Sequence, residues 1–93
     1  MSHRSIDDIA SQVTTQSGAI VSKVVHHGDG LDVTVFAIDT GQGLTEHTAS
    51  RAAIVQVISG QLMFTADGQA LAAGPGFWLH MAPGTPHALT AME

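Results

Sequence analysis

Short apolar runs separated by glycine and proline are the feature that most constrains how this chain can fold. In one run, Leu31 to Ile38, successive side chains alternate between two faces, and another, Ala53 to Ile58, is almost wholly apolar. Alternation with a period of two is typical of β-strands. Asp67-Gly68 lies between two further apolar runs and is a strong hairpin signal. The chain is therefore expected to consist mainly of short, paired β-strands.

The spacing of these turns indicates the fold class. From about residue 19 onward, turn residues recur at intervals of roughly 8–12 residues, which divides the chain into about seven or eight short strands. No strand–helix alternation is present, which excludes a parallel α/β sheet. The prediction is an all-β protein, an antiparallel sandwich or small barrel of the jelly-roll kind. A short N-terminal helix or arm precedes it, with Ser5 as N-cap and Asp7 and Asp8 in the first turn.

Composition and charge exclude several classes of function. The chain has 93 residues, of which 44% are hydrophobic and 12% charged, so we expect one folded domain, 1–93, with its core at about 19–91. It contains no cysteine, which excludes disulfides and zinc–thiolate sites. A net charge of −5 disfavours nucleic acid. No apolar run approaches the ~20 residues that span a membrane, and the polar N-terminus is unlike a signal peptide. The predicted location is cytoplasmic.

Two of the six histidines are expected to point into the barrel. His87 shares its strand face with Leu89 and Ala91, and His47 shares its face with Ala49 and Ala53 if no bulge intervenes. An inward imidazole needs a partner, because a buried unpaired polar group costs roughly 1–3 kcal/mol. That partner is a metal, a ligand, water or another side chain.

The remaining histidines lie in different settings. His80 shares a strand face with Trp78 and is the third candidate site residue. His26 and His27 precede a glycine-rich turn and are assigned to its solvated flank, and His3 lies in the polar N-terminal segment.

Two segments around the candidate histidines resemble the motifs of the cupin superfamily. Gly43-Leu44-Thr45-Glu46-His47, followed by Ala53 to Gly60, is similar to the first motif. Gly76 to His87 is similar to the second, and its Pro83-Gly84-Thr85-Pro86-His87 run is the more specific part. The resemblance covers about residues 19–91 and implies a double-stranded β-helix, the cupin jelly-roll barrel, which is often dimeric.

The resemblance also implies a metal site, but with a degenerate ligand set. Many cupins bind Fe, Mn, Ni or Zn through two histidines and a glutamate of the first motif and one histidine of the second. His47 and His87 match the first and last of these, whereas Ala49 and Ala53 occupy the other two positions. His80 is the predicted replacement ligand, giving a candidate divalent transition-metal site of His47, His87 and His80. Glu46 and Gln56 are weaker candidates, since strand alternation points both away from His47.

Three functions remain open from the sequence, and whether the chain is an enzyme is not decided. The first is metal-dependent chemistry on a small polar or anionic molecule. The second is a metal-free binding or sensor module, in which the alanines leave room for a ligand above Trp78, Phe64 or Met63, and Arg51 pairs with an anion. The third is a metal-free isomerase, which requires a histidine–carboxylate dyad.

The end of the sequence predicts self-association. Cupin barrels usually continue past the second motif with at least one more strand, whereas this sequence ends at Glu93. Either the sequence is truncated, or another chain or the N-terminal segment pairs with the open edge. Because an unpaired edge strand is a liability, we expect a homodimer formed by strand exchange or edge pairing, with a small-molecule ligand in each barrel.

Overall fold

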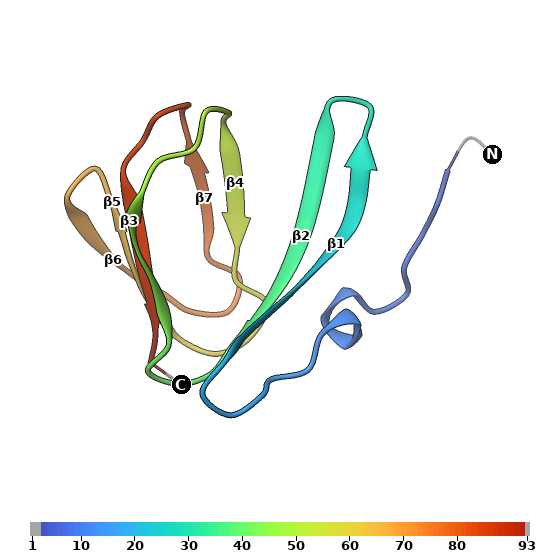
Figure 1. Ribbon diagram of the computed structural model, residues 1–93, viewed down its shortest axis with the longest axis horizontal. Helices are drawn as coiled ribbons and strands as arrows, with labels where there is room; N and C mark the ends of the chain where they lie inside the picture. Colours follow the sequence, from blue (N-terminus) through green and yellow to red (C-terminus); the bar gives the residue numbers. More distant parts are fainter. Residues whose placement is uncertain (1–2, 93) are drawn as a thin grey trace.

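The computed structural model describes residues 3–92, which form eight β-strands and one short 3-10 helix (Figure 1). In chain order these are η1 (Ile9–Gln12), β1 (Ile20–Gly28), β2 (Leu31–Ile38), β3 (Gly43–His47), β4 (Ala53–Gln56), β5 (Leu62–Ala66), β6 (Gln69–Ala73), β7 (Trp78–Met81) and β8 (His87–Ala91). The all-β prediction is confirmed.

The strands form three antiparallel sheets. The largest has the order β3-β8-β5-β6, and two two-stranded sheets, β1-β2 and β4-β7, accompany it. β8 lies between β3 and β5, although these three strands are far apart in sequence, so long-range pairing fixes the topology. The Asp67-Gly68 turn joins β5 to β6 with φ of 52° and 77° at its two residues. Both residues adopt the positive φ that a tight hairpin turn requires, as their sequence predicts.

The core lies between the four-stranded sheet and β4-β7. Its buried members are Val57, Phe64, Ala73 and Met81, and the half-buried side chains packed on them include Val55, Leu79 and Leu89. Phe64 is 1% exposed, whereas its neighbour Met63 is 41% exposed on the opposite face of β5. Strand alternation therefore gives each sheet one face toward this core.

The β1-β2 hairpin stands beside these two sheets and makes few contacts with them (Figure 1). One of its faces is covered by η1 and the N-terminal arm, where Lys23 donates a hydrogen bond to Gln12 at 3.1 Å. The other face turns Val24 and Phe36 away from the arm, and these are 60% and 51% exposed. The hairpin therefore has one packed face and one unpacked apolar face.

The N-terminal helix is shorter and later than predicted. Residues 5–8 are not helical, and Asp8 rather than Ser5 is the N-cap, accepting a hydrogen bond from the Ala10 amide at 3.2 Å. The prediction of Ser5 as the N-cap was wrong. A helix of four residues gains little stability from helix propensity, so it forms where it can pack against β2.

Replacement of Phe64 by alanine tests whether this side chain anchors the core. We expect Phe64→Ala to lower the free energy of unfolding by about 3–5 kcal/mol, because it removes a fully buried ring and leaves a cavity. The matched control is Met63→Ala on the outer face of the same strand, which should cost less than about 1 kcal/mol. Urea unfolding measures both, and equal losses would contradict the assigned orientation of β5.

Candidate functional site

His47 and His87 lie directly opposite each other on neighbouring strands. The β3-β8 register pairs the two residues, and their ring centroids are 4.2 Å apart with the planes inclined at 57°. A register irregularity between Leu44 and His47 brings this about, because it inserts an extra residue into β3. Regular alternation was expected from His47 to Ala53. The bulge lies outside that segment, on the N-terminal side of His47.

Both imidazoles belong to the inner face of the four-stranded sheet. His87 pairs with Ala66 on β5, and Leu89 pairs with Phe64 in the same register, so these four residues share one face. The Phe64 and His87 rings are nearly parallel, with centroids 6.2 Å apart. The core therefore ends at Phe64, and the histidine pair lies next to it on the same face of the sheet, with His87 half-buried and His47 exposed.

Each ring is held in one orientation by a backbone carbonyl. His47 Nδ1 donates to Thr45 O at 2.8 Å, and His87 Nδ1 donates to Thr85 O at 2.9 Å. Because a carbonyl oxygen only accepts, Nδ1 carries the proton in each ring and Nε2 of the neutral ring keeps its lone pair. In residues 3–92 no protein group bonds either Nε2, and no unpartnered nitrogen is fully buried. Two accessible acceptor nitrogens thus meet at one place.

His80 is not part of this pair. It is exposed and lies opposite Ile54 in the β4-β7 register, on the face that turns away from the core. There it lines a separate hollow of about 380 Å³ with Asp67 and Thr85. Within the described part of the chain, no three histidine or carboxylate side chains come together as a metal-binding group. The structure brings together two of the three predicted ligands.

The residues at the other ligand positions add no donor. Ala53 faces the core opposite Met81, and Ala49 contributes only its carbonyl, which accepts from the Gly84 amide at 2.8 Å. Glu46 is exposed within the bulge of β3, and Gln56 lies on the outer face of β4, as alternation predicted.

Trp78, Phe64 and Met63 were the residues expected beneath a ligand in the barrel, and for two of them this expectation is wrong. Phe64 lies beneath His87, as expected. Trp78 is 58% exposed on the outer face of β7, and Met63 lies on the outer face of β5, so neither faces the interior. Trp78 and Met63 are both apolar, and hydrophobicity alone does not show that they lie on the outer faces of their strands.

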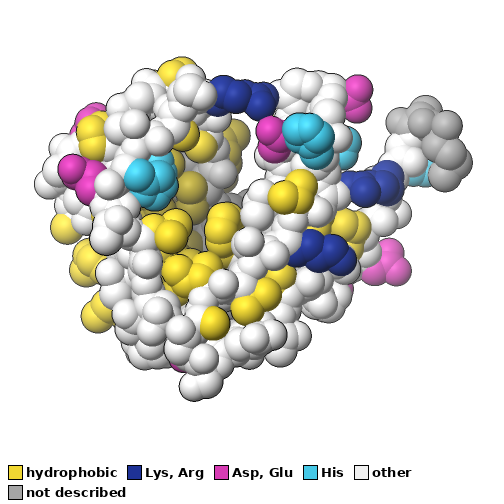
Figure 2. Space-filling view, in the orientation of Figure 1, with side chains coloured by type: hydrophobic (Ala, Val, Ile, Leu, Met, Phe, Trp, Pro, Cys, Tyr) yellow, Lys and Arg dark blue, Asp and Glu magenta, His cyan; other side chains and the backbone are white. Residues whose placement is uncertain are grey.

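A hollow lined by hydrophobic side chains separates the four-stranded sheet from the β1-β2 hairpin (Figure 2). The unpacked face of the hairpin, with Val24 and Phe36, turns toward it, since the opposite face is covered by the arm. Basic, acidic and histidine side chains gather at the upper rim of the hollow in this view. Hydrophobic side chains therefore line the interior of the hollow, and charged and histidine side chains lie at its mouth in this view.

A charged cluster ties the tip of the hairpin to the rim of the barrel. Arg51, in the β3-β4 connection, donates to Asp32 Oδ2 at 3.1 Å and to Gly30 O at 2.8 Å. His27 Nδ1 lies 2.5 Å from the other carboxylate oxygen. The hydrogen bond from His27, with further attraction from His27 and Arg51, holds the pKa of Asp32 below its ordinary value of 3.8. Arg51, considered above as an anion ligand, is thus occupied by Asp32.

This cluster was not predicted from the sequence. His27 does flank a solvated turn, as expected, and is 82% exposed, but its contact with Asp32 was not foreseen. β1 continues through Gly28, so His27 and Asp32 face each other across the hairpin. Two-residue turn geometry at Asp29-Gly30 would have placed them in register.

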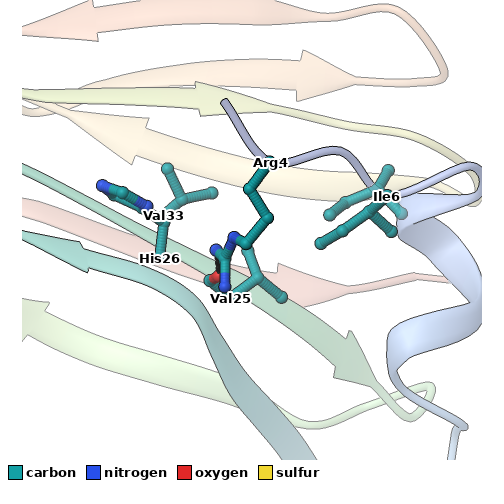
Figure 3. A pocket seen from close by; sticks show the side chains of 6 residues that line it. Arg4, Ile6, Val25, His26 and Val33 are labelled. Carbon is teal, nitrogen blue, oxygen red and sulfur yellow. Dashed lines mark hydrogen bonds between the residues drawn. The ribbon is translucent and has the colours of Figure 1, made fainter. Parts of the chain in front are cut away.

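A third hollow, of about 390 Å³, lies between the N-terminal arm and the hairpin (Figure 3). Arg4 reaches across it and donates a hydrogen bond to the carbonyl of Val25, while Ile6 and Val33 border it. Since the guanidinium already binds the backbone, this contact is best explained as an anchor for the arm.

The fold and the inward histidine pair define a small cupin. Residues 31–92 match the family model of the AraC-like ligand binding domain. Because this match spans more than half of the chain, the protein belongs to that family, whose name describes a ligand-binding domain. No curated protein matches the sequence. Within the described residues, no helix combines the length and hydropathy needed to cross a membrane.

Solved structures agree with this assignment. A conserved protein of unknown function from Streptococcus pyogenes is 29% identical, with a TM-score of 0.86 over 100% of this chain and 82% of that one. A cupin 2 conserved barrel domain protein from Leptotrichia buccalis is 30% identical, with a TM-score of 0.84 over 90% of this chain and 40% of that one. An RmlC-like cupin from Desulfovibrio desulfuricans, 24% identical, has a TM-score of 0.83 over 97% of this chain and 88% of that one, and shows the fold alone. The predicted cupin jelly-roll barrel is confirmed.

The pH dependence of the hairpin tip tests the charged cluster. Because the pKa of Asp32 is lowered in the folded state, its contribution is present above the ordinary pKa and disappears as the pH falls through the lower folded value. We expect Asp32→Asn to increase hydrogen exchange at the hairpin tip at pH 6, and the difference from wild type to vanish at strongly acidic pH. Asp29→Asn, in the same turn, is the control. A difference that persists unchanged at acidic pH would contradict an ionic role.

Proposed function

We propose that this protein is a binding module whose barrel holds a small molecule against His47 and His87. The observation that carries the proposal is the pair of accessible Nε2 lone pairs, with ring centroids 4.2 Å apart, beside the buried Phe64 ring. A few convergent polar groups on an otherwise apolar concave surface are typical of small-molecule sites. Membership in a ligand-binding domain family supports the same reading.

The protonation of the two rings indicates the chemistry of the ligand. With Nδ1–H donated to a carbonyl in each ring, both Nε2 atoms of the neutral rings are acceptors. Two adjacent acceptors favour a group that donates hydrogen bonds, such as a hydroxyl or an ammonium. A carboxylate only accepts hydrogen bonds, so it would bind the two Nε2 atoms only if the imidazole rings were protonated. We therefore propose a small hydroxylated molecule with an apolar part that rests near Phe64.

A divalent transition metal is the second candidate, and one observation favours it. A backbone hydrogen bond that fixes Nδ1–H and orients Nε2 is the usual arrangement around metal-bound histidine. The donor set does not complete a site of three protein ligands, which catalytic zinc typically uses. Fe, Mn, Ni or Zn bound by His47 and His87 would thus need solvent or ligand atoms to complete its coordination. The role of His80 as a ligand stays a prediction.

Enzymatic activity is not part of the proposal. The isomerase hypothesis requires a carboxylate beside the catalytic histidine. In the described residues Glu46, the nearest in sequence, is exposed and forms no hydrogen bond or ion pair with His47, whose ring bonds Thr45 O. The histidine–carboxylate contact that does form, between His27 and Asp32, is exposed at the hairpin tip.

We also propose that the protein forms a homodimer. β1, β6 and β7 each end a sheet with one unpaired edge, and Ile54 and Trp78 form an exposed apolar pair on the outer face of β4-β7. Exposed edges and apolar faces favour association. A cytoplasmic location stays a prediction.

A thermal-shift screen tests the ligand proposal. Protein treated with EDTA is scanned with cyclohexanol, benzyl alcohol and 1,2-hexanediol, each a hydroxyl compound with an apolar part, at millimolar concentration. We expect at least one compound to raise the Tm of wild type and of His80→Ala by 2 °C or more, and to lose this effect in His47→Gln and His87→Gln. His80→Ala is the matched control because it removes an imidazole from the outer face. No shift with any compound, or shifts that survive both glutamine variants, would count against the site.

Elemental analysis separates the two candidates. Protein purified without chelator or added metal is measured by inductively coupled plasma mass spectrometry. Close to one equivalent of Fe, Mn, Ni or Zn per chain, reduced at least tenfold in both His47→Ala and His87→Ala, would favour the metal candidate. Metal content below a tenth of an equivalent, persisting after reconstitution, would leave the metal-free module.

Size-exclusion chromatography with light scattering tests the dimer. We expect twice the mass of one 9.6 kDa chain at micromolar concentration, and a shift toward monomer in Trp78→Lys. A clean monomer for wild type at that concentration would refute the homodimer.

A further inference from the structure

An irregularity in β1 turns two successive side chains toward the N-terminal arm. The β1-β2 register shifts between Val24 and His26, so Val25 is an extra residue without a partner on β2. Val25 is buried and His26 is half-buried, and both line the hollow of about 390 Å³ between the arm and the hairpin (Figure 3). The carbonyl of Val25 accepts a hydrogen bond from Arg4 of the arm. The bulge thus shapes the hollow and gives the arm an attachment beside it.

Apolar side chains from both the arm and the hairpin form the walls of this hollow. Ile6 of the arm and Ile9 of η1 contribute one wall, and Val25 and Val33 of the hairpin contribute another. Ile6 and Val33 remain 36% and 37% exposed. Water therefore reaches hydrophobic surface on two elements at once, and a hydrocarbon chain between them would remove that surface from water.

Arg4 is a cation that keeps unused hydrogen-bond donors at this hollow. Its contact with the carbonyl of Val25 uses Nη2, and a guanidinium carries five N–H groups, so Nε and Nη1 keep theirs. In the part of the chain that the structure describes, both ion pairs lie at the hairpin tip and neither includes Arg4. In Figure 3 the Arg4 side chain lies between Ile6 and His26. Because a guanidinium matches a carboxylate in geometry and charge, Arg4 is suited to bind one beside the apolar walls.

The charge around the hollow favours an anion, although the whole chain carries a net charge of −5. Two of the three Lys and Arg residues, Arg4 and Lys23, lie where the arm meets the hairpin, and Lys23 there donates to Gln12 at 3.1 Å. The acidic residues of the arm, Asp7 and Asp8, are exposed and do not line the hollow, and Asp8 caps η1. The permanent charge in the lining is therefore that of Arg4.

We propose that this hollow binds a small aliphatic carboxylate, with the carboxylate on Arg4 and the hydrocarbon chain between Ile9 and Val33. One guanidinium balances a single negative charge, and most of the remaining lining is apolar. A volume of about 390 Å³ is at the lower end of the range for ligand pockets, roughly 300–1,000 Å³, which limits the ligand to a short chain. The ligand contacts the arm and the hairpin together, so it holds the arm in place. The site lies on the arm face of the hairpin and does not depend on any ligand at His47 and His87.

A heteronuclear NMR titration tests the site and locates it on the full chain. Spectra are recorded with sodium acetate, butyrate and hexanoate at millimolar concentration and constant ionic strength. We expect hexanoate to give saturable shifts in the amides around Ile9, Val25 and Val33, and the affinity to rise by up to about fourfold for each added methylene. Methyl hexanoate, which has the same chain but no charge, should bind at least about tenfold more weakly. No saturable shift at these amides, or equal affinity for hexanoate and its ester, would overturn the proposal.

Two variants separate the charge from the apolar wall. Arg4→Gln should weaken hexanoate binding at least about tenfold, whereas Arg51→Gln, which removes the cation at the hairpin tip, should leave it unchanged. Val33→Thr keeps the shape of the side chain and leaves Arg4 in place, so it should reduce the preference for hexanoate over acetate by about threefold. An unchanged preference in Val33→Thr would refute the site, even where Arg4→Gln abolishes binding by releasing the arm.

The His47→Gln variant distinguishes this site from the one in the barrel. Hexanoate should bind to it as it binds to wild type, with the same amides shifted. Loss of binding in His47→Gln, together with wild-type shifts centred on His87, would place the carboxylate in the barrel and overturn the proposal. Failure of every hydroxyl compound to bind in the barrel would leave the result at the arm unaffected.

Discussion

The placement of β8 between β3 and β5 is the constraint on which the rest of this structure depends. Only a strand that is hydrogen-bonded on both sides fixes two registers at once, and here those registers align His87 with His47 on one side and with Ala66 on the other. The same pairing sets Phe64 beside His87. Removal of β8 from this position would separate the two imidazoles and open the core, so the candidate site and the fold share one set of backbone hydrogen bonds.

The molecule divides into a packed part and an unpacked part. The four-stranded sheet and β4-β7 enclose the buried side chains, including Phe64 and Met81. The hairpin is attached at its ends, by the chain that leads from β2 into β3 at its base and by Arg51 at its tip. Between these attachments its apolar face remains exposed. This division explains why hydrophobic side chains line the hollow beside the hairpin.

Sequence reasoning succeeded where the determining contacts were local. Alternation placed His87 on the apolar face of its strand, and Asp67-Gly68 predicted its hairpin correctly, because both depend on neighbouring residues. It failed for Trp78 and Met63, since alternation assigns residues to two faces but does not say which face is covered. Trp78 and His80 share a face, and that face proved to be the outer one.

By itself the sequence determined the strands, their turns, the all-β class and the two motifs that resemble the cupins, because period-two alternation and glycine positions act over a few residues. Only the tertiary structure decided which of the histidines meet and that the Arg51 guanidinium binds Asp32. These depend on pairings between residues far apart in sequence, such as His47 with His87, whose register is set by hydrogen bonds that local pattern does not encode.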